Sequence, residues 1–173
     1  GGVIRIDDTS SAAVSGYLNI DTVTRANTLA VDRVNGYVYY TVGNTYLYRK
    51  NIHSATIQTD TPEQFDLAVD LPNFSTRGIA VDEQGFVYLT NNVPALESVV
   101  KYDPRPSANP RVVASTPLVR WTPWDVMVKN GMVVVSGSTP NQLRYFDENL
   151  VPLVPPTYGG PAGDLFVGPE RFL

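Results

Sequence analysis

Short apolar and aromatic runs, separated by turn residues, cover almost the whole chain. The runs are rich in Val, Ile, Tyr and Thr, and they are interrupted by Gly, Pro, Asn and Asp. This pattern is typical of strands joined by tight turns, and almost no segment has the periodicity of an amphipathic helix. Val34-Asn35-Gly36 and Lys129-Asn130-Gly131 predict hairpin turns, because Asn-Gly supplies the positive φ angles that such turns require.

A longer pattern returns about every 50 residues, a spacing that predicts a repeat architecture. Each copy has an apolar run that ends in a charged residue, then a glycine, then a second apolar run. The copies are Leu29–Asp32, Gly36 and Tyr37–Tyr40; Ile79–Asp82, Gly85 and Phe86–Leu89; and, more weakly, Val126–Lys129, Gly131 and Met132–Val135.

Each copy continues with two further predicted strands. The third strands are Tyr46–Arg49, Val99–Asp103 and Leu143–Asp147, and the fourth strands are Phe65–Val69, Arg111–Ala114 and Leu150–Leu153. Four antiparallel strands in a repeat of about 40 to 50 residues are typical of a β-propeller blade. We therefore expect an all-β fold of stacked four-stranded sheets, whose middle strands are buried on both faces.

The two ends of the chain fall within blades in this interpretation. Val3–Asp7 matches a third strand, Ala13–Leu18 would be a fourth strand, and Arg171–Leu173 matches the opening of a first strand at Arg77. The chain is then one domain, 1–173. Its predicted parts are the end of one blade at 1–19, blades at 27–70, 77–117 and 124–154, and the first strand of another blade at 165–173.

The segment from Gly78 to Asp103 resembles an NHL repeat, and it is also similar to YncE-like and gluconolactonase-like propellers. Propellers with such repeats usually have about six or seven blades, so the resemblance implies that this chain is roughly half of a ring. An open half ring would expose an apolar blade face and unpaired strand edges. We expect residues outside this chain to complete the ring; a second copy, or closure of a small ring by Leu165–Leu173, are the alternatives.

Composition narrows the function classes further. The chain has 173 residues, 43% of them hydrophobic, which is ample for a packed core, and a formal net charge of −4. Nucleic acids and anionic membranes favour a basic face, so neither is expected as the main partner, and no apolar stretch is long enough to insert into a membrane. The absence of cysteine excludes disulfides and thiolate chemistry. Mild acidity and many turns fit an exported protein, secreted or periplasmic, without requiring one.

In a propeller, the ligand usually sits among the loops that enter each first strand. The corresponding residues here are Asn27, Arg77, Trp124 and Arg171, with Arg25, Arg120, Trp121, Asp125 and Glu170 near them. Arg and Trp are enriched in binding hot spots, and Arg binds carboxylate or phosphate in a bidentate manner. We expect this mouth to bind a protein or a small anionic ligand. The alternative is that the arginines are solvated or paired and that both tryptophans cover the core.

Evidence for catalysis is weak, and no catalytic residue is predicted. The resemblance to gluconolactonase-like propellers implies a divalent ion, such as calcium, in the central channel; Asn27, Asp125 and Glu170 are weak candidate ligands, although that family's motif is missing around them. His53 is the only histidine and lies in a polar loop, so we expect a surface residue rather than a catalytic base. The aspartates that end the strands, Asp32 and Asp82 among them, are expected to cap turns.

Two proline-rich segments, Pro104–Pro110 and Val154–Pro161, are interpreted as rigid surface connections, with docking loops as the alternative. Taken together, the sequence predicts a non-enzymatic binding or scaffold module that needs no cofactor. A metal-dependent lactonase-like hydrolase and a purely structural domain of a larger exported protein are the alternatives.

Overall fold

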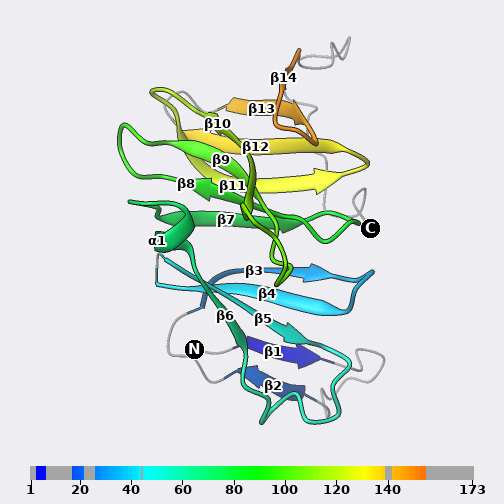
Figure 1. Ribbon diagram of the computed structural model, residues 1–173. Coiled ribbons are helices and arrows are strands. Elements are labelled where there is room, and N and C mark those ends of the chain that lie inside the picture. Colours follow the sequence, from blue (N-terminus) through cyan, green and yellow to red (C-terminus); the bar gives the residue numbers. More distant parts are fainter. Residues whose placement is uncertain (1–2, 7–16, 22–25, 44, 139–141, 155–173) are drawn as a thin grey trace.

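The computed structural model describes residues 3–6, 17–21, 26–43, 45–138 and 142–154, and these residues form an all-β fold (Figure 1). Three four-stranded antiparallel sheets and one two-stranded sheet make up the fold. The only helix of the described residues is α1, Leu67–Asp70, and none of their helices could cross a membrane. The predicted all-β fold with four-stranded sheets is therefore confirmed.

Within every four-stranded sheet, strands that follow one another in the sequence are neighbours. The two-stranded sheet consists of β1 (Val3–Ile6) and β2 (Tyr17–Asp21). The first four-stranded sheet consists of β3 (Ala26–Asp32), β4 (Tyr37–Val42), β5 (Tyr46–Asn51) and β6 (Glu63–Asp66). The second sheet consists of β7 (Thr76–Val81), β8 (Val87–Asn91), β9 (Ser98–Tyr102) and β10 (Val112–Pro117). The third sheet consists of β11 (Thr122–Lys129), β12 (Met132–Ser138), β13 (Gln142–Asp147) and β14 (Pro152–Leu153).

Aspartate side chains hold the first hairpin turns, as the sequence predicts. Asp32 Oδ1 accepts hydrogen bonds from the backbone nitrogens of residues 34 and 35, at 3.1 and 2.9 Å. Asp82 Oδ1 accepts from those of residues 84 and 86, at 3.0 and 2.9 Å. In the third sheet the turn uses Asn130 and Gly131, both at positive φ, which is the pair of angles that a two-residue hairpin needs.

The fourth strands differ from the prediction. The predicted strand Phe65–Val69 ends at Asp66, and the chain then turns into α1. Asp66 causes this change, because its Oδ1 accepts from the backbone nitrogen of Ala68 at 3.0 Å and caps the helix. The predicted strand Arg111–Ala114 extends further, as β10 from Val112 to Pro117, and of the predicted strand Leu150–Leu153 only Pro152–Leu153 forms a strand, β14. Residues 13–16 and 165–173, which carry other predicted strands, lie outside the described residues.

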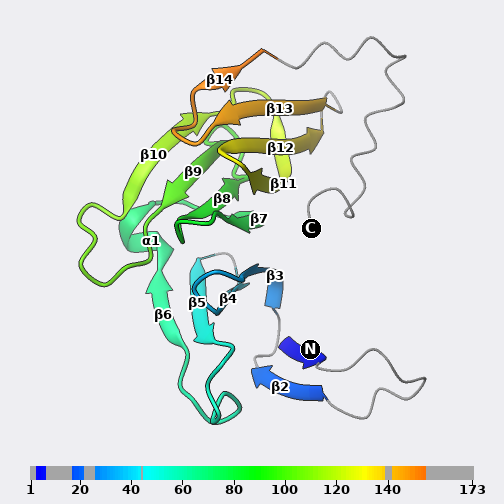
Figure 2. The ribbon, with the colours of Figure 1, turned by 90° about the vertical axis from the view of Figure 1, so that its right-hand side faces the viewer.

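The four-stranded sheets stack face to face, and two apolar clusters fill the spaces between them (Figures 1 and 2). Tyr39, Phe65 and Leu89 belong to the cluster between the first and second sheets, and Tyr88 and Trp121 to that between the second and third. The middle strands β4 and β8 are buried on both faces, which accounts for their continuous apolar runs, whereas in β12 only Val133 and Val135 are fully buried.

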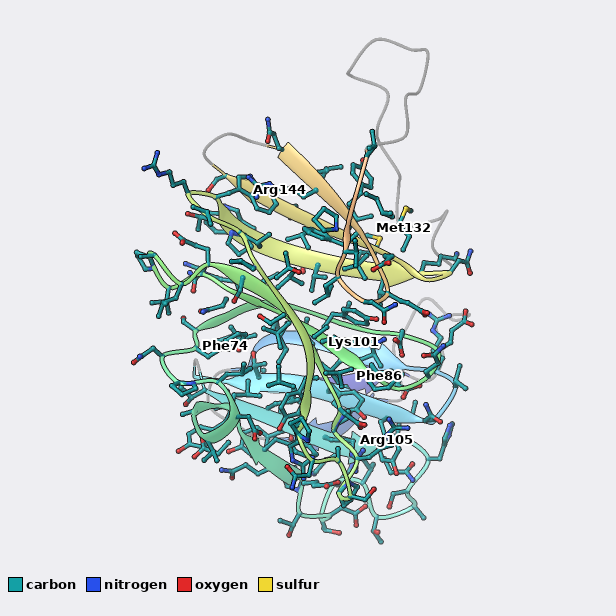
Figure 3. All side chains as sticks on the ribbon, turned by 45° about the horizontal axis from the view of Figure 1, so that its top comes forward. Phe74, Phe86, Lys101, Arg105, Met132 and Arg144 are labelled. Carbon is teal, nitrogen blue, oxygen red and sulfur yellow. The ribbon has the colours of Figure 1, made fainter. Side chains whose placement is uncertain are left out.

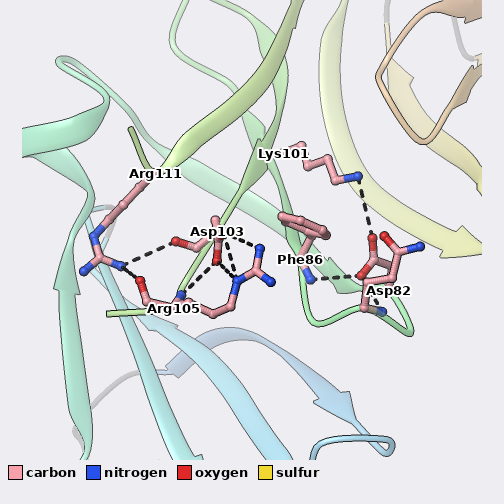
Figure 4. A network of polar contacts seen from close by, with 7 residues as sticks. Asp82, Phe86, Lys101, Asp103, Arg105 and Arg111 are labelled. Carbon is pink, nitrogen blue, oxygen red and sulfur yellow. Dashed lines mark hydrogen bonds and ion pairs between the residues drawn. The ribbon is translucent and has the colours of Figure 1, made fainter. Parts of the chain in front are cut away.

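Polar contacts cross both spaces and fix how the sheets sit on one another. Tyr102 Oη donates to Asp70 Oδ2 at 2.7 Å, which joins the second sheet to α1. Lys101 Nζ donates to the backbone oxygen of Glu148 at 3.0 Å, which joins the second sheet to the third. The same ammonium group lies 4.3 Å from the centre of the Phe86 ring and 4.0 Å from Asp82 Oδ2 (Figure 4). A buried lysine is thus stabilised by an acceptor, an aromatic face and a carboxylate.

Candidate functional site

The first strands of the three sheets lie side by side, with β7 between β3 and β11 (Figure 2). The approach of β7 to β11 is very close at Gly78. A Cβ atom added there would lie 2.6 Å from Asp125 Cα and 2.9 Å from the backbone nitrogen of Val126. Glycine at this position therefore allows the backbones of β7 and β11 to meet. Their contact brings Arg77, which precedes Gly78, close to Trp124, which precedes Asp125.

Each first strand has an irregularity of register just after its start. It falls between Ala26 and Leu29 in β3, between Thr76 and Ile79 in β7, and between Pro123 and Asp125 in β11. β-Bulges of this kind bend a strand and change the direction of a side chain, and they are frequent next to binding sites. The bulges contain three of the predicted mouth residues, Asn27, Arg77 and Trp124, and all three are exposed.

Arg77 and Trp124 form the central contact of the candidate site. The guanidinium carbon of Arg77 lies 5.0 Å from the centre of the Trp124 ring, and the Trp124 residue is 50% exposed. One orientation of the Asn92 amide satisfies the hydrogen-bonding groups around it. In this orientation its oxygen accepts a hydrogen bond from Arg77 Nε at 2.8 Å, and its nitrogen donates one to Ser75 Oγ at 3.0 Å. Within the described part of the chain, Arg77 makes no ion pair. The Arg77 guanidinium is therefore oriented by an aromatic ring and an amide, and no described carboxylate forms an ion pair with it.

The other predicted mouth residues are placed differently. Asn27 donates from Nδ2 to the backbone oxygen of Gly43, so it supports its own sheet. Trp121 is fully buried, and the Arg144 guanidinium carbon lies 4.4 Å from the centre of its ring, so this tryptophan belongs to the core (Arg144 is labelled in Figure 3). Arg120 is exposed, at a positive φ, in the connection between β10 and β11. Arg25, Glu170 and Arg171 lie outside the described residues.

The structure gives little support to the candidate metal ligands. Asp125 Oδ1 accepts from the backbone nitrogen of Val126 at 2.9 Å and lies against Gly78. Packing against this backbone removes water from the carboxyl group and raises its pKa, although other parts of the residue are exposed. Among the residues that the structure describes, no group of three or more His, Cys, Asp and Glu side chains is arranged to hold a metal ion. His53 is exposed, as predicted.

A groove that the sequence analysis did not predict lies beside Arg120. It has a volume of about 530 Å³, and it is lined by residues of the β8–β9 loop, the end of β10 and the following turn: Ala95, Leu96, Glu97, Ser98, Ser115, Pro117, Val119 and Arg120. Leu96 and Val119 are 48% and 70% exposed. The sequence signal that could have revealed this groove is the presence of Leu96 and Val119 in turn segments, because turns are ordinarily polar.

A second cavity, of about 400 Å³, lies at the opposite end of the first strands, where the hairpin turns of all three sheets meet. Its walls include Val31, Val81 and Val128, which occupy the same position in the three repeats, and its rim includes Asp32 and Asp82. These two carboxylates already accept hydrogen bonds from turn backbone. They therefore maintain the turns and do not form a free pair for acid–base chemistry.

The proline-rich segment 104–110 is held by its neighbours (Figure 4). Arg105 donates to both carboxylate oxygens of Asp103, and the Arg111 guanidinium donates to the backbone oxygen of Arg105 at 3.0 Å. These contacts favour the interpretation of this segment as a rigid connection. Of the second proline-rich segment, only residue 154 is described.

Comparisons with known proteins add no relative. No protein-family model matches the chain, and no curated protein matches it. The resemblance of residues 78–103 to NHL repeats therefore stays a prediction.

Proposed function

We propose that the protein is a non-enzymatic binding module, which holds an anionic group of its partner at the end where the first strands begin. The observation that carries this proposal is the Arg77 guanidinium, which is exposed, lies 5.0 Å from the centre of the Trp124 ring and donates from Nε to the Asn92 amide when that amide is oriented to satisfy its neighbours. A guanidinium that is held at Nε leaves its terminal nitrogens for a carboxylate or phosphate, which it can bind with two parallel hydrogen bonds. Because the side chain is already oriented, binding loses less conformational entropy.

We also propose that the three four-stranded sheets are successive blades of a β-propeller of the NHL or YncE-like type. Face-to-face stacking and adjacent first strands support this arrangement. So does the register, in which Ala30, Ala80 and Met127 are equivalent. Ala30 and Ala80 pack under the next sheet, whereas Met127 is 39% exposed on the outer face of the third sheet. In a ring, a further blade would cover this face.

The lactonase-like alternative needs oxygen ligands that converge on one ion. Of its three candidates, Asn27 contacts its own hairpin and Asp125 lies against the β7 backbone. No observation on the described residues favours this alternative, and the binding proposal therefore stands alone.

The binding proposal can be tested by titrating the protein with N-acetylglutamate and with inorganic phosphate while tryptophan fluorescence, to which Trp121 and Trp124 both contribute, is recorded. We expect saturable binding with a dissociation constant on the order of 1 mM, which corresponds to about 4 kcal/mol. Arg77→Gln should abolish the response, and Arg77→Lys should weaken it, because lysine lacks the planar fork. Arg33→Gln is the matched control, because Arg33 is an exposed arginine at the opposite end of β3. Binding that survives Arg77→Gln would refute the proposal.

A further inference from the structure

The apolar groove at Leu96 and Val119 belongs to the same end of the molecule as the Arg77–Trp124 pair, and one loop connects them. The β8–β9 loop begins at Asn92, which hydrogen-bonds Arg77, and it continues into the groove lining at residues 95–98. A partner that binds the guanidinium can therefore follow the loop to the groove.

Hydrogen bonds hold one wall of the groove in place and join it to the other wall. On one wall, Asn91 Nδ2 donates to the backbone oxygen of Leu96 at 2.8 Å, and Asn91 Oδ1 accepts from the backbone nitrogens of residues 75 and 93. The two walls are joined by a hydrogen bond of 2.7 Å from the backbone nitrogen of Leu118 to the backbone oxygen of Glu97. Leu118 itself is buried in the core. The groove is thus formed before a partner arrives, which lowers the entropic cost of binding.

The chemistry of the lining indicates what the groove accepts. Leu96 and Val119 offer apolar surface, and Ser98 and Ser115 add polar groups to the lining. Arg120 stands exposed at the rim and makes no ion pair within the described part of the chain. Glu97 is the one acidic residue of the lining. An apolar side chain flanked by a carboxylate directed to Arg120 complements this surface.

We propose that the partner is a peptide segment that carries a large apolar side chain between acidic residues. The apolar side chain fills the groove between Leu96 and Val119, one carboxylate contacts Arg120, and another is held by Arg77 on Trp124. This inference rests on the proposed function, because it assigns the partner of the same end of the molecule. It differs from capture of a small anion, which needs Arg77 alone and gains nothing from the groove.

The test uses an array of acidic peptides of about ten residues, with one leucine at varied spacing from two glutamates, and a matched array with serine in place of leucine. We expect the best leucine peptide to bind the whole protein about tenfold more tightly than its serine counterpart, because a buried leucine contributes at least about 1.4 kcal/mol. In the variant that combines Leu96→Ser with Val119→Ser, this tenfold advantage should disappear. Both residues are exposed, so the variant should fold, and circular dichroism and thermal unfolding verify that it does.

Charge variants complete the experiment. Arg120→Gln should weaken the leucine peptide several-fold, whereas Glu97→Gln should strengthen it, because it removes the one acid near the incoming carboxylate. If no leucine peptide exceeds its serine counterpart while N-acetylglutamate still binds through Arg77, the peptide inference is wrong and the proposed function stands. If N-acetylglutamate does not bind either, the proposed function is wrong as well.

Discussion

Replacing Gly78 by alanine tests the packing that creates the candidate site. The added Cβ would lie 2.6 Å from Asp125 Cα, and both Asp125 Cα and the nearby Val126 nitrogen are backbone atoms that cannot rotate away. The strands β7 and β11 would therefore have to separate by roughly 1 Å to restore ordinary contact. Overpacking of this kind costs about 1 to 3 kcal/mol. For a chain of this length, about 2 kcal/mol corresponds to a fall in Tm of roughly 4 to 8 °C.

The assay is thermal and urea unfolding of Gly78→Ala beside the control Gly43→Asn. Gly43 has a φ of +60° and no atom within 4 Å of an added Cβ, and asparagine tolerates this backbone conformation. The control adds only the backbone strain of a left-handed residue, which asparagine tolerates best among residues with side chains, so it should cost at most about 1 kcal/mol and less than Gly78→Ala. We also expect Gly78→Ala to weaken N-acetylglutamate binding, because it displaces Arg77 from Trp124. An unchanged Tm in Gly78→Ala would show that β7 and β11 do not meet there.

Two further predictions follow from side-chain environments. Hydrogen bonds from Arg105 lower the pKa of Asp103 below its ordinary value of 3.8, so this pair stabilises the fold above that pH and loses its effect as the pH falls through the lowered value. Arg105→Gln should therefore reduce the free energy of unfolding at pH 7 only slightly, since Arg105 is exposed, and the difference should vanish in acid; a difference that is constant with pH would contradict this. Trp121→Ala should cost about 3 to 5 kcal/mol in urea unfolding, and Trp124→Ala should cost distinctly less because half of its surface is already exposed; equal costs would contradict the assigned burial.

The sheets could be predicted from the sequence because two simple signals agree. Apolar runs such as Tyr37–Val42 indicate strands buried on both faces, and Asn130-Gly131 has the φ angles of a two-residue turn. The fourth strands were predicted less well, because edge strands have a weaker pattern. Phe65–Val69 is apolar enough for a strand, but the Asp66 side chain caps the backbone of Ala68 and starts a helical turn.

The candidate site could be predicted only in part. Repeat alignment identified Arg77 and Trp124 as equivalent positions, and the structure brings them together because their strands are adjacent. Alignment could not show that Trp121, which precedes β11, is buried whereas Trp124, within β11, is half exposed, since burial depends on how the sheets pack. The groove was missed because its two walls are distant in the sequence, and a hydrogen bond from Leu118 joins them.

The most direct test of the central claim, that Arg77 on Trp124 is the anion-binding group, is a side-chain NMR titration. Nitrogen-15-labelled protein is titrated with N-acetylglutamate, and the arginine Nε–H and tryptophan indole signals are followed. The account predicts saturable shifts of Arg77 Nε and of the Trp124 indole, with the Trp121 indole and the Arg33 Nε unchanged. Shifts of equal size at Arg33 and Arg77, or a response at Trp121 without one at Trp124, would contradict it.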